Sequence, residues 1–180
     1  MEPVHLRLAE IGLRVAARYG FALAGGYAVQ AHGILDRPSE DVDLFTGWDR
    51  RDEFATAVHA VVDGYRESGY TVEIMQLFET FARLAVTDPA LADRSFKVEL
   101  AANWRALPPV MMDIGPVLHV DDVVAGKMSA LFTRAEPRDF LDIDAALTTG
   151  RYTRARPLHP RPAVRAGRAS RRRVRPAHLG

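Results

Sequence analysis

The pattern of apolar and polar positions divides the first part of the chain into alternating helices and strands. From Val4 to Tyr19 apolar residues recur with helical spacing, and Gly20 follows as a C-terminal cap. Residues 21–24, Phe-Ala-Leu-Ala, are a short apolar run typical of a buried strand. A short helix is predicted over 27–34, and a longer amphipathic helix over 50–67.

The second part of the chain predicts strands followed by helices. Three strands are expected over residues 70–78, 81–86 and 96–101. The first two are close enough in the sequence to form a hairpin. A small strand pair is predicted over 110–120, and two helices over 122–134, with Asp121 or Asp122 as cap, and over 137–150. This order predicts an α/β (α+β) fold, a mixed twisted sheet flanked by helices and followed by C-terminal helices.

Two carboxylates stand on one face of a strand predicted at 41–45. Because side chains alternate along a strand, Asp41 and Asp43 share one face while Val42 and Leu44 share the other. A pair of carboxylates backed by an apolar face offers the hard oxygen ligands that Mg²⁺ prefers.

A glycine pair precedes these carboxylates and completes a motif. At Gly25 and Gly26 the backbone turns tightly or approaches a ligand, and the amides of the following helix start are suited to phosphate. The whole pattern resembles the first motif of nucleotidyltransferases of the DNA polymerase β type, and more narrowly that of the AbiEii/AbiGii toxin family of type IV toxin–antitoxin pairs. The matching positions are Gly25, Gly26, Arg37, Ser39, Asp41 and Asp43. Gly26 stands where the superfamily has serine, so one hydroxyl contact to phosphate is missing, and backbone amides could replace it.

The resemblance also implies a third metal-binding carboxylate on a later strand, and Glu99 matches that position. In the predicted strand Lys97 and Glu99 face away from the apolar side chains. The alternative is that Glu99 is a solvent-facing residue on an edge strand. Glu73 is the competing candidate, and we expect it to be a surface residue.

A second motif lies in the two C-terminal helices. It resembles the family's pattern Lys-x-x-Ala-x-x-x-Arg followed by Arg/Lys-Asp-x-x-Asp, at Lys127, Ala130, Arg134, Arg138, Asp139 and Asp142. Helical spacing places Lys127 and Arg134 on one stripe. The resemblance implies that Lys127 and Arg134 bind the nucleotide, and that Lys127, Asp139 and Asp142 belong to the catalytic set together with Asp41 and Asp43. We expect Lys127 to be a flexible surface residue that faces the two carboxylates across a cleft; the alternative is a network of surface salt bridges.

Composition separates an acidic body from a basic tail. Residues 1–150 hold 14 basic and 23 acidic residues, a net charge of −9, whereas residues 151–180 hold ten arginines and no acid. The expected organisation is a catalytic core (1–120), a helical segment (121–150) and a tail (151–180) that is disordered or an out-of-frame reading of GC-rich coding sequence. Family members continue with further helices where this chain departs from them, near residue 154. The chain has no cysteine, no long apolar run and no signal-peptide pattern, so we expect a cytoplasmic protein without disulfides or membrane spans.

Three functions compete at this stage. The resemblance implies a toxin that uses two Mg²⁺ ions to transfer a nucleoside monophosphate from a nucleoside triphosphate to an acceptor hydroxyl. It favours the tRNA 3′ end as acceptor, and an antitoxin encoded nearby as partner. Alternatively, the chain is a degenerate member of the fold that binds a nucleotide or a partner without turnover. The third and weakest hypothesis is an RNA-binding protein that acts through the arginine tail alone.

Overall fold

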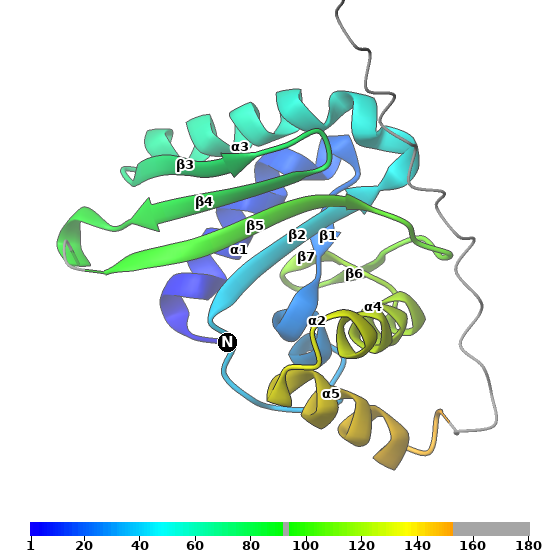
Figure 1. Ribbon diagram of the computed structural model, residues 1–180. Coiled ribbons are helices and arrows are strands. Elements are labelled where there is room, and N and C mark those ends of the chain that lie inside the picture. The colour runs from blue at the N-terminus through cyan, green and yellow to red at the C-terminus, as the bar shows by residue number, and fades with distance from the viewer. Residues whose placement is uncertain (92–93, 153–180) are drawn as a thin grey trace, which may run out of the picture.

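A mixed β-sheet organises the fold (Figure 1). The computed structural model describes residues 1–91 and 94–152. Within them the sheet has seven strands in the order β3-β4-β5-β2-β1-β7-β6. The strands are β1 (Ala22–Leu23), β2 (Asp41–Gly47), β3 (Thr71–Leu77), β4 (Phe81–Thr87), β5 (Ser95–Asn103), β6 (Val110–Met112) and β7 (Gly115–Val117). β2 is parallel to β5 and β1 to β7, while the other neighbours are antiparallel, which confirms the predicted mixed sheet.

Helices lie on two sides of this sheet. They are α1 (Pro3–Ala16), α2 (Gly25–Ala31), α3 (Phe54–Glu67), α4 (Val120–Thr133) and α5 (Pro137–Thr148). Figure 1 shows α1 and α3 together along one side, and α4 and α5 beside α2 at the other. Short 3-10 turns occupy Ala17–Tyr19, Trp48–Glu53 and Pro89–Leu91. Gly20 ends the first of these turns with a left-handed φ of 75°, as expected for a glycine cap.

The core lies between the sheet and the α1–α3 side. Val42 and Leu44 of β2 and Val98 and Leu100 of β5 are each fully buried there. Their alternation leaves the neighbouring side chains, Asp43 and Glu99 among them, on the opposite face of the sheet. The apolar half of each strand therefore fixes which face carries the polar residues.

One alternative and one expectation about local structure were wrong. The alternative that Glu99 lies on an edge strand fails, because β5 is enclosed between β4 and β2. The N-terminal cap of α4 is neither Asp121 nor Asp122: it is His119, whose Nδ1 accepts a hydrogen bond from the Asp121 amide at 3.2 Å. The carboxylate of Asp122 instead binds the backbone of the segment that follows β5. Among the described residues no helix combines the length and hydrophobicity that a membrane crossing requires.

Candidate active site

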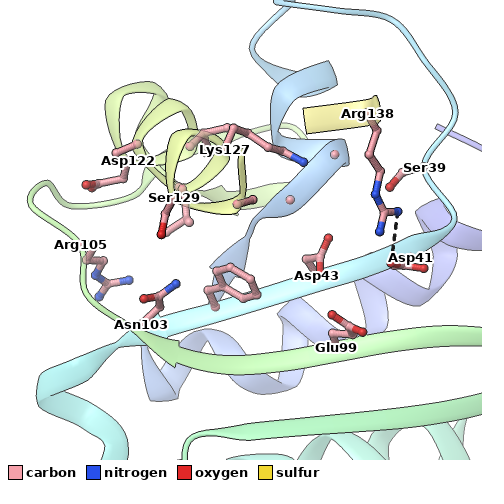
Figure 2. A pocket seen from close by; sticks show the side chains of 18 of the residues that line it. Ser39, Asp41, Asp43, Glu99, Asn103, Arg105, Asp122, Lys127, Ser129 and Arg138 are labelled. Carbon is pink, nitrogen blue, oxygen red and sulfur yellow. Dashed lines mark ion pairs between the residues drawn. The ribbon is translucent and has the colours of Figure 1, made fainter. Parts of the chain in front are cut away.

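A pocket of about 290 Å³ opens on the polar face of β2 and β5. The start of α2 and one side of α4 form its other walls. Figure 2 shows Asp41, Asp43, Glu99 and Asn103 along the two strands, with Lys127 and Ser129 above them on α4. The pocket thus brings together the Asp-x-Asp strand and the helix that carries Lys127.

The strand register places the three predicted metal ligands on one surface. β2 and β5 are parallel neighbours, with Asp43 beside Glu99 and Asp41 two positions before Asp43 on the same face. Burial raises the pKa of Asp43 to about 6, and the negative charges of Glu99 and Asp41 act in the same direction. A divalent cation would relieve this repulsion, and carboxylate oxygens are the donors that Mg²⁺ takes. Asp41, Asp43 and Glu99 therefore carry the type of ligand atom that Mg²⁺ prefers.

In the described part of the chain, these three carboxylates do not form a preformed metal-binding cluster. Asp41 Oδ1 lies 2.8 Å from Lys97 Nζ, and Asp41 Oδ2 lies 3.9 Å from Arg138. Glu99 pairs with Arg83 on the adjacent strand at 2.8 Å. In the part of the chain that the structure describes, no set of three acidic, histidine or cysteine side chains is close enough together to hold an ion. In this arrangement two of the three carboxylates pair with basic side chains, and the assignment of all three to one metal site stays a prediction.

The glycine pair is required by what lies next to it. Gly25 has φ of 59°, and a Cβ there would lie 1.8 Å from Asp43 Oδ2, so no other residue fits this position without displacing the carboxylate. A Cβ at Gly26 would lie 2.7 Å from Ser39 Oγ. The hydroxyl of Ser39 thus occupies the space into which a serine at position 26 would project.

Lys127 lines the pocket, but it is not the flexible surface residue that we expected. Only 8% of the residue is exposed, and its Nζ lies 2.8 Å from Asp142 Oδ2. Arg37 donates two further hydrogen bonds of 2.7 Å to the same carboxylate. Burial acts to raise the pKa of Asp142, but the hydrogen bonds from Arg37 and Lys127 outweigh it and hold that pKa below its ordinary value.

A second pair joins the two C-terminal helices. Arg134 of α4 donates hydrogen bonds of 2.9 and 3.0 Å to the fully buried carboxylate of Asp139 on α5, and these bonds hold the pKa of Asp139 below its ordinary value. Asp139 and Asp142 lie behind the pocket wall, whereas Arg37, Lys127, Arg134 and Arg138 line it. The structure thus brings every basic residue of the two motifs to the pocket and places Asp139 and Asp142 behind them as anionic partners.

The pocket also contains residues that the motifs did not indicate. They include Phe45 on β2, Asn103 at the end of β5, Arg105 after it, and Asp122 and Ser129 on α4. Continued strand alternation from Asp43 and Glu99 would have found Phe45 and Asn103. No local signal marks Asp122, because its partners are the amides of Ala106 and Leu107 at 2.9 Å each.

Comparison with protein families gives a match over nearly the whole chain. The family described as "Nucleotidyl transferase AbiEii toxin, Type IV TA system" matches residues 8–179. The match continues past residue 154, where we expected the sequence to depart from this family. Comparison with curated protein sequences gives no significant match.

Several solved structures share the fold. JHP933 from Helicobacter pylori superposes with a TM-score of 0.59 at 16% identity, over 83% of this chain and 65% of its own. The nucleotidyltransferase toxin MenT4 (Rv2826c) from Mycobacterium tuberculosis H37Rv gives 0.56 at 19% identity, over 81% of this chain and 58% of its own. The Megavirus polyadenylate synthase gives 0.57 at 12% identity, over 82% of this chain and 32% of its own. The chain thus spans less than two thirds of the length of these three proteins.

Proposed function

Because the chain belongs to the AbiEii nucleotidyl transferase toxin family, we propose that it is a Mg²⁺-dependent nucleotidyltransferase toxin of a type IV toxin–antitoxin system. It transfers a nucleoside monophosphate from a nucleoside triphosphate to an acceptor hydroxyl, for which we propose the 3′ end of a tRNA. An antitoxin encoded nearby is its proposed partner. The observation that carries the proposal is one pocket in which a carboxylate face on β2 and β5 meets a basic wall from α4 and α5.

The carboxylate face is the proposed metal site. Asp41, Asp43 and Glu99 would hold two Mg²⁺ ions once Lys97, Arg138 and Arg83 give way. Bound Mg²⁺ supplies activation of the acceptor hydroxyl and neutralises the charge on the phosphate oxygens. The raised pKa of Asp43 supports this assignment, because a buried carboxylate surrounded by like charges gains most from a cation.

The basic wall is the proposed triphosphate site. Three basic side chains form ion pairs with the two carboxylates behind this wall: Arg37 and Lys127 pair with Asp142, and Arg134 pairs with Asp139. These ion pairs fix the positions of the three positive charges along the wall. Ser39 is 7% exposed and lies beside Gly26, so its hydroxyl can serve the phosphate in place of the serine that position 26 lacks. In the proposed reaction the acceptor oxygen forms a bond to the α-phosphorus. The bond from that phosphorus to the pyrophosphate oxygen breaks, the hydroxyl proton passes to solvent, and the charge that develops on the leaving pyrophosphate faces the wall.

The competing proposal is a non-catalytic member of the fold that binds a nucleotide or a partner. Gly26 is the observation that favours it, and the proximity of Ser39 to the same space weakens that argument. Both proposals predict nucleotide binding, but only the enzyme releases pyrophosphate.

The decisive experiment incubates the full chain with Mg²⁺, each labelled nucleoside triphosphate and a tRNA pool, and measures both pyrophosphate release and label on the RNA. We expect release with at least one nucleotide, and its loss in Asp41→Asn. Glu73→Gln is the matched control, because Glu73 is an exposed acid on β3, outside the pocket. Nucleotide binding without release for all four nucleotides would support the non-catalytic alternative, and release without label on RNA would refute tRNA as the acceptor.

A further inference from the structure

The loop between α2 and β2 carries two of the pocket residues and leads directly into the carboxylate strand. Residues 32–40 form neither helix nor strand, yet Arg37 and Ser39 lie within them and line the pocket, and β2 begins at Asp41. Asp142 holds Arg37 through two hydrogen bonds of 2.7 Å. Figure 2 shows Ser39 and Asp41 at the same end of the pocket. Because the loop has no backbone ladder, the position of the Ser39 hydroxyl depends on other contacts.

Tyr27 of α2 holds the backbone of Ser39. Its hydroxyl donates a hydrogen bond of 3.1 Å to the Ser39 carbonyl, and only 1% of the tyrosine is exposed. Tyr27 directly follows Gly26, and a Cβ at Gly26 would lie 2.7 Å from Ser39 Oγ. Two consecutive residues of α2 therefore define both the backbone position of Ser39 and the space that its hydroxyl occupies.

His5 of α1 completes a chain of hydrogen bonds behind the pocket. Its Nδ1 is hydrogen-bonded to the Tyr27 hydroxyl, and its ring packs edge-on against Phe96 of β5 with the ring centres 5.6 Å apart. Burial lowers the pKa of His5 and raises the pKa of Tyr27, so the neutral form of each predominates at neutral pH. Because the single proton of the phenol goes to Ser39, the Nδ1 of His5 carries the hydrogen of the other bond.

A buried tyrosine hydroxyl needs a hydrogen-bond partner in any protein core, so such a bond by itself indicates only stability. Tyr65 is an example, since its buried hydroxyl donates to the Leu8 carbonyl at 2.9 Å and neither residue lines the pocket. Tyr27 differs in its acceptor, because Ser39 is itself a residue of the pocket wall. Movement of the Tyr27 hydroxyl would therefore be passed on to the site.

We propose that Tyr27 and His5 are positioning residues for the nucleotide: Tyr27 holds the Ser39 hydroxyl at the place where it meets a phosphate oxygen, and His5 holds Tyr27. Neither Tyr27 nor His5 lines the pocket, so both act through Ser39. The proposal rests on the proposed function, since it needs a triphosphate bound beside Gly26. It extends the set of residues on which phosphate binding depends from the pocket wall back to α1.

A double-mutant cycle between Tyr27→Phe and Ser39→Ala tests this arrangement. Equilibrium binding of each of the four nucleoside triphosphates is measured with Mg²⁺ on the full-length wild type, on both single variants and on the double variant. Tyr65→Phe is the matched control, because it removes a buried hydroxyl of the same kind outside the pocket. His5→Leu and His5→Asn test the second link, since an asparagine amide can donate to Tyr27 and leucine cannot.

We expect Ser39→Ala to weaken binding of the preferred triphosphate by about tenfold, the effect of losing a hydrogen bond to a charged group. Tyr27→Phe should weaken it by about three- to tenfold. In the Ser39→Ala background Tyr27→Phe should have no further effect, because two residues that act through one contact are not additive. Tyr65→Phe should bind as the wild type does. His5→Leu should resemble Tyr27→Phe, and His5→Asn should recover the affinity.

Independent effects would give a different result. Wild-type affinity in Tyr27→Phe or in Ser39→Ala, losses that multiply in full in the double variant, or an equal loss in Tyr65→Phe each overturn the positioning role and leave the proposed function standing. Wild-type affinity in His5→Leu, or no recovery in His5→Asn, overturns the part assigned to His5. Failure of the wild type to bind any of the four triphosphates overturns both the positioning role and the proposed function. If Tyr27→Phe does not fold, His5→Leu alone and combined with Ser39→Ala decides in the same way.

Discussion

At the scale of single residues, Asp43 differs from three other carboxylates in and behind the pocket. Asp41, Glu99 and Asp142 each have a basic partner within 2.8 Å, whereas Asp43 forms no ion pair with any residue that the structure describes. Its pKa of about 6 follows from burial and from its acidic neighbours. In its ionised form Asp43 is therefore destabilised by burial and by neighbouring negative charges, as expected for a carboxylate that binds a cation.

Asp43→Asn should stabilise the metal-free protein at neutral pH. The pKa rises from 3.8 to about 6 on folding, so the folded state holds this proton more tightly than the unfolded state. Stability is therefore lost as the pH rises from about 4 to about 6, and the penalty of the order of 1–3 kcal/mol persists above pH 6. Because asparagine does not ionise, the variant does not have this penalty. Thermal unfolding of both proteins between pH 4 and pH 8 checks the result.

The same variant tests the metal site. Mg²⁺ should raise the melting temperature of the wild type by mass action, less so below pH 6, where Asp43 is protonated. Asp43→Asn should remove most of this increase. An equal Mg²⁺ effect in wild type and variant would place the ion elsewhere.

Lys127→Ala should affect both stability and turnover. The buried ammonium pairs with Asp142, so its removal should cost about 1–3 kcal/mol, limited by the two hydrogen bonds that Arg37 retains. Loss of a charge-assisted contact to the triphosphate should lower turnover sharply, and Lys127→Arg should restore it only in part. Chemical denaturation and pyrophosphate release per folded molecule separate the two effects.

The control for Lys127 is Arg50→Ala, which removes an exposed pair with Glu53 at 3.1 Å. Such a pair contributes less than about 1 kcal/mol, and the variant should keep full turnover. If Lys127→Ala loses stability but keeps its turnover per folded molecule, the lysine acts only in the salt-bridge network with Asp142.

At the scale of elements, the site depends on two junctions. The parallel register of β2 and β5 sets Asp43 beside Glu99, and the ion pairs between α4 and α5 fix the basic wall. A third contact, from Asp122 of α4 to the segment after β5, ties the wall to the sheet. Neither the sheet nor the helices would form the pocket alone.

Asp122→Ala should loosen the segment after β5 while leaving the sheet intact. The amides of Ala106 and Leu107 lose their acceptor, which should cost about 1–3 kcal/mol for groups that water does not reach fully. Hydrogen exchange should become faster at these two amides and remain unchanged in the core of β2. Asp122→Asn keeps one acceptor oxygen and should have a smaller effect. Unchanged exchange at both amides in Asp122→Ala would show that the segment is held by other contacts.

At the scale of the whole molecule, charge is divided between two regions. The first 150 residues carry a net charge of −9, and the ten arginines of 151–180 balance it. The predicted disorder or aberrant reading of this tail falls almost wholly on residues 153–180, outside the described part of the chain, but the family match includes them as far as residue 179. The tail is therefore proposed as the part that attracts RNA phosphates, while the pocket performs the transfer.

Deletion of residues 153–180 should separate these roles. Association with tRNA should weaken and lose most of its dependence on salt, because phosphate contacts by arginine release counterions. Binding of the nucleoside triphosphate should change little, since every described residue that lines the pocket lies before position 139. Equilibrium binding of both ligands at two salt concentrations checks this. Loss of triphosphate binding as well would show that the tail contributes to the pocket.

The sequence by itself determined the order of elements and the identity of most polar groups in the pocket. Strand alternation placed Asp41 with Asp43, and helical spacing placed Lys127 with Arg134, because both periodicities follow from the backbone alone. The hairpins at 77–81 and 112–115 could also be predicted, because each joins two strands that follow one another in the sequence. Local geometry was enough for each of these features.

Only the tertiary structure decided which charges meet. Lys127 is buried because Asp142, fifteen positions later and on another helix, lies 2.8 Å away, and Arg37 reaches the same carboxylate from 105 positions before. The ion pairs of Asp41 and Glu99 with basic side chains and the role of Asp122 likewise depend on contacts between segments that are apart in the sequence. A periodicity describes one element, whereas burial and ion pairing depend on how elements pack, so these features could not be read from the pattern along the chain.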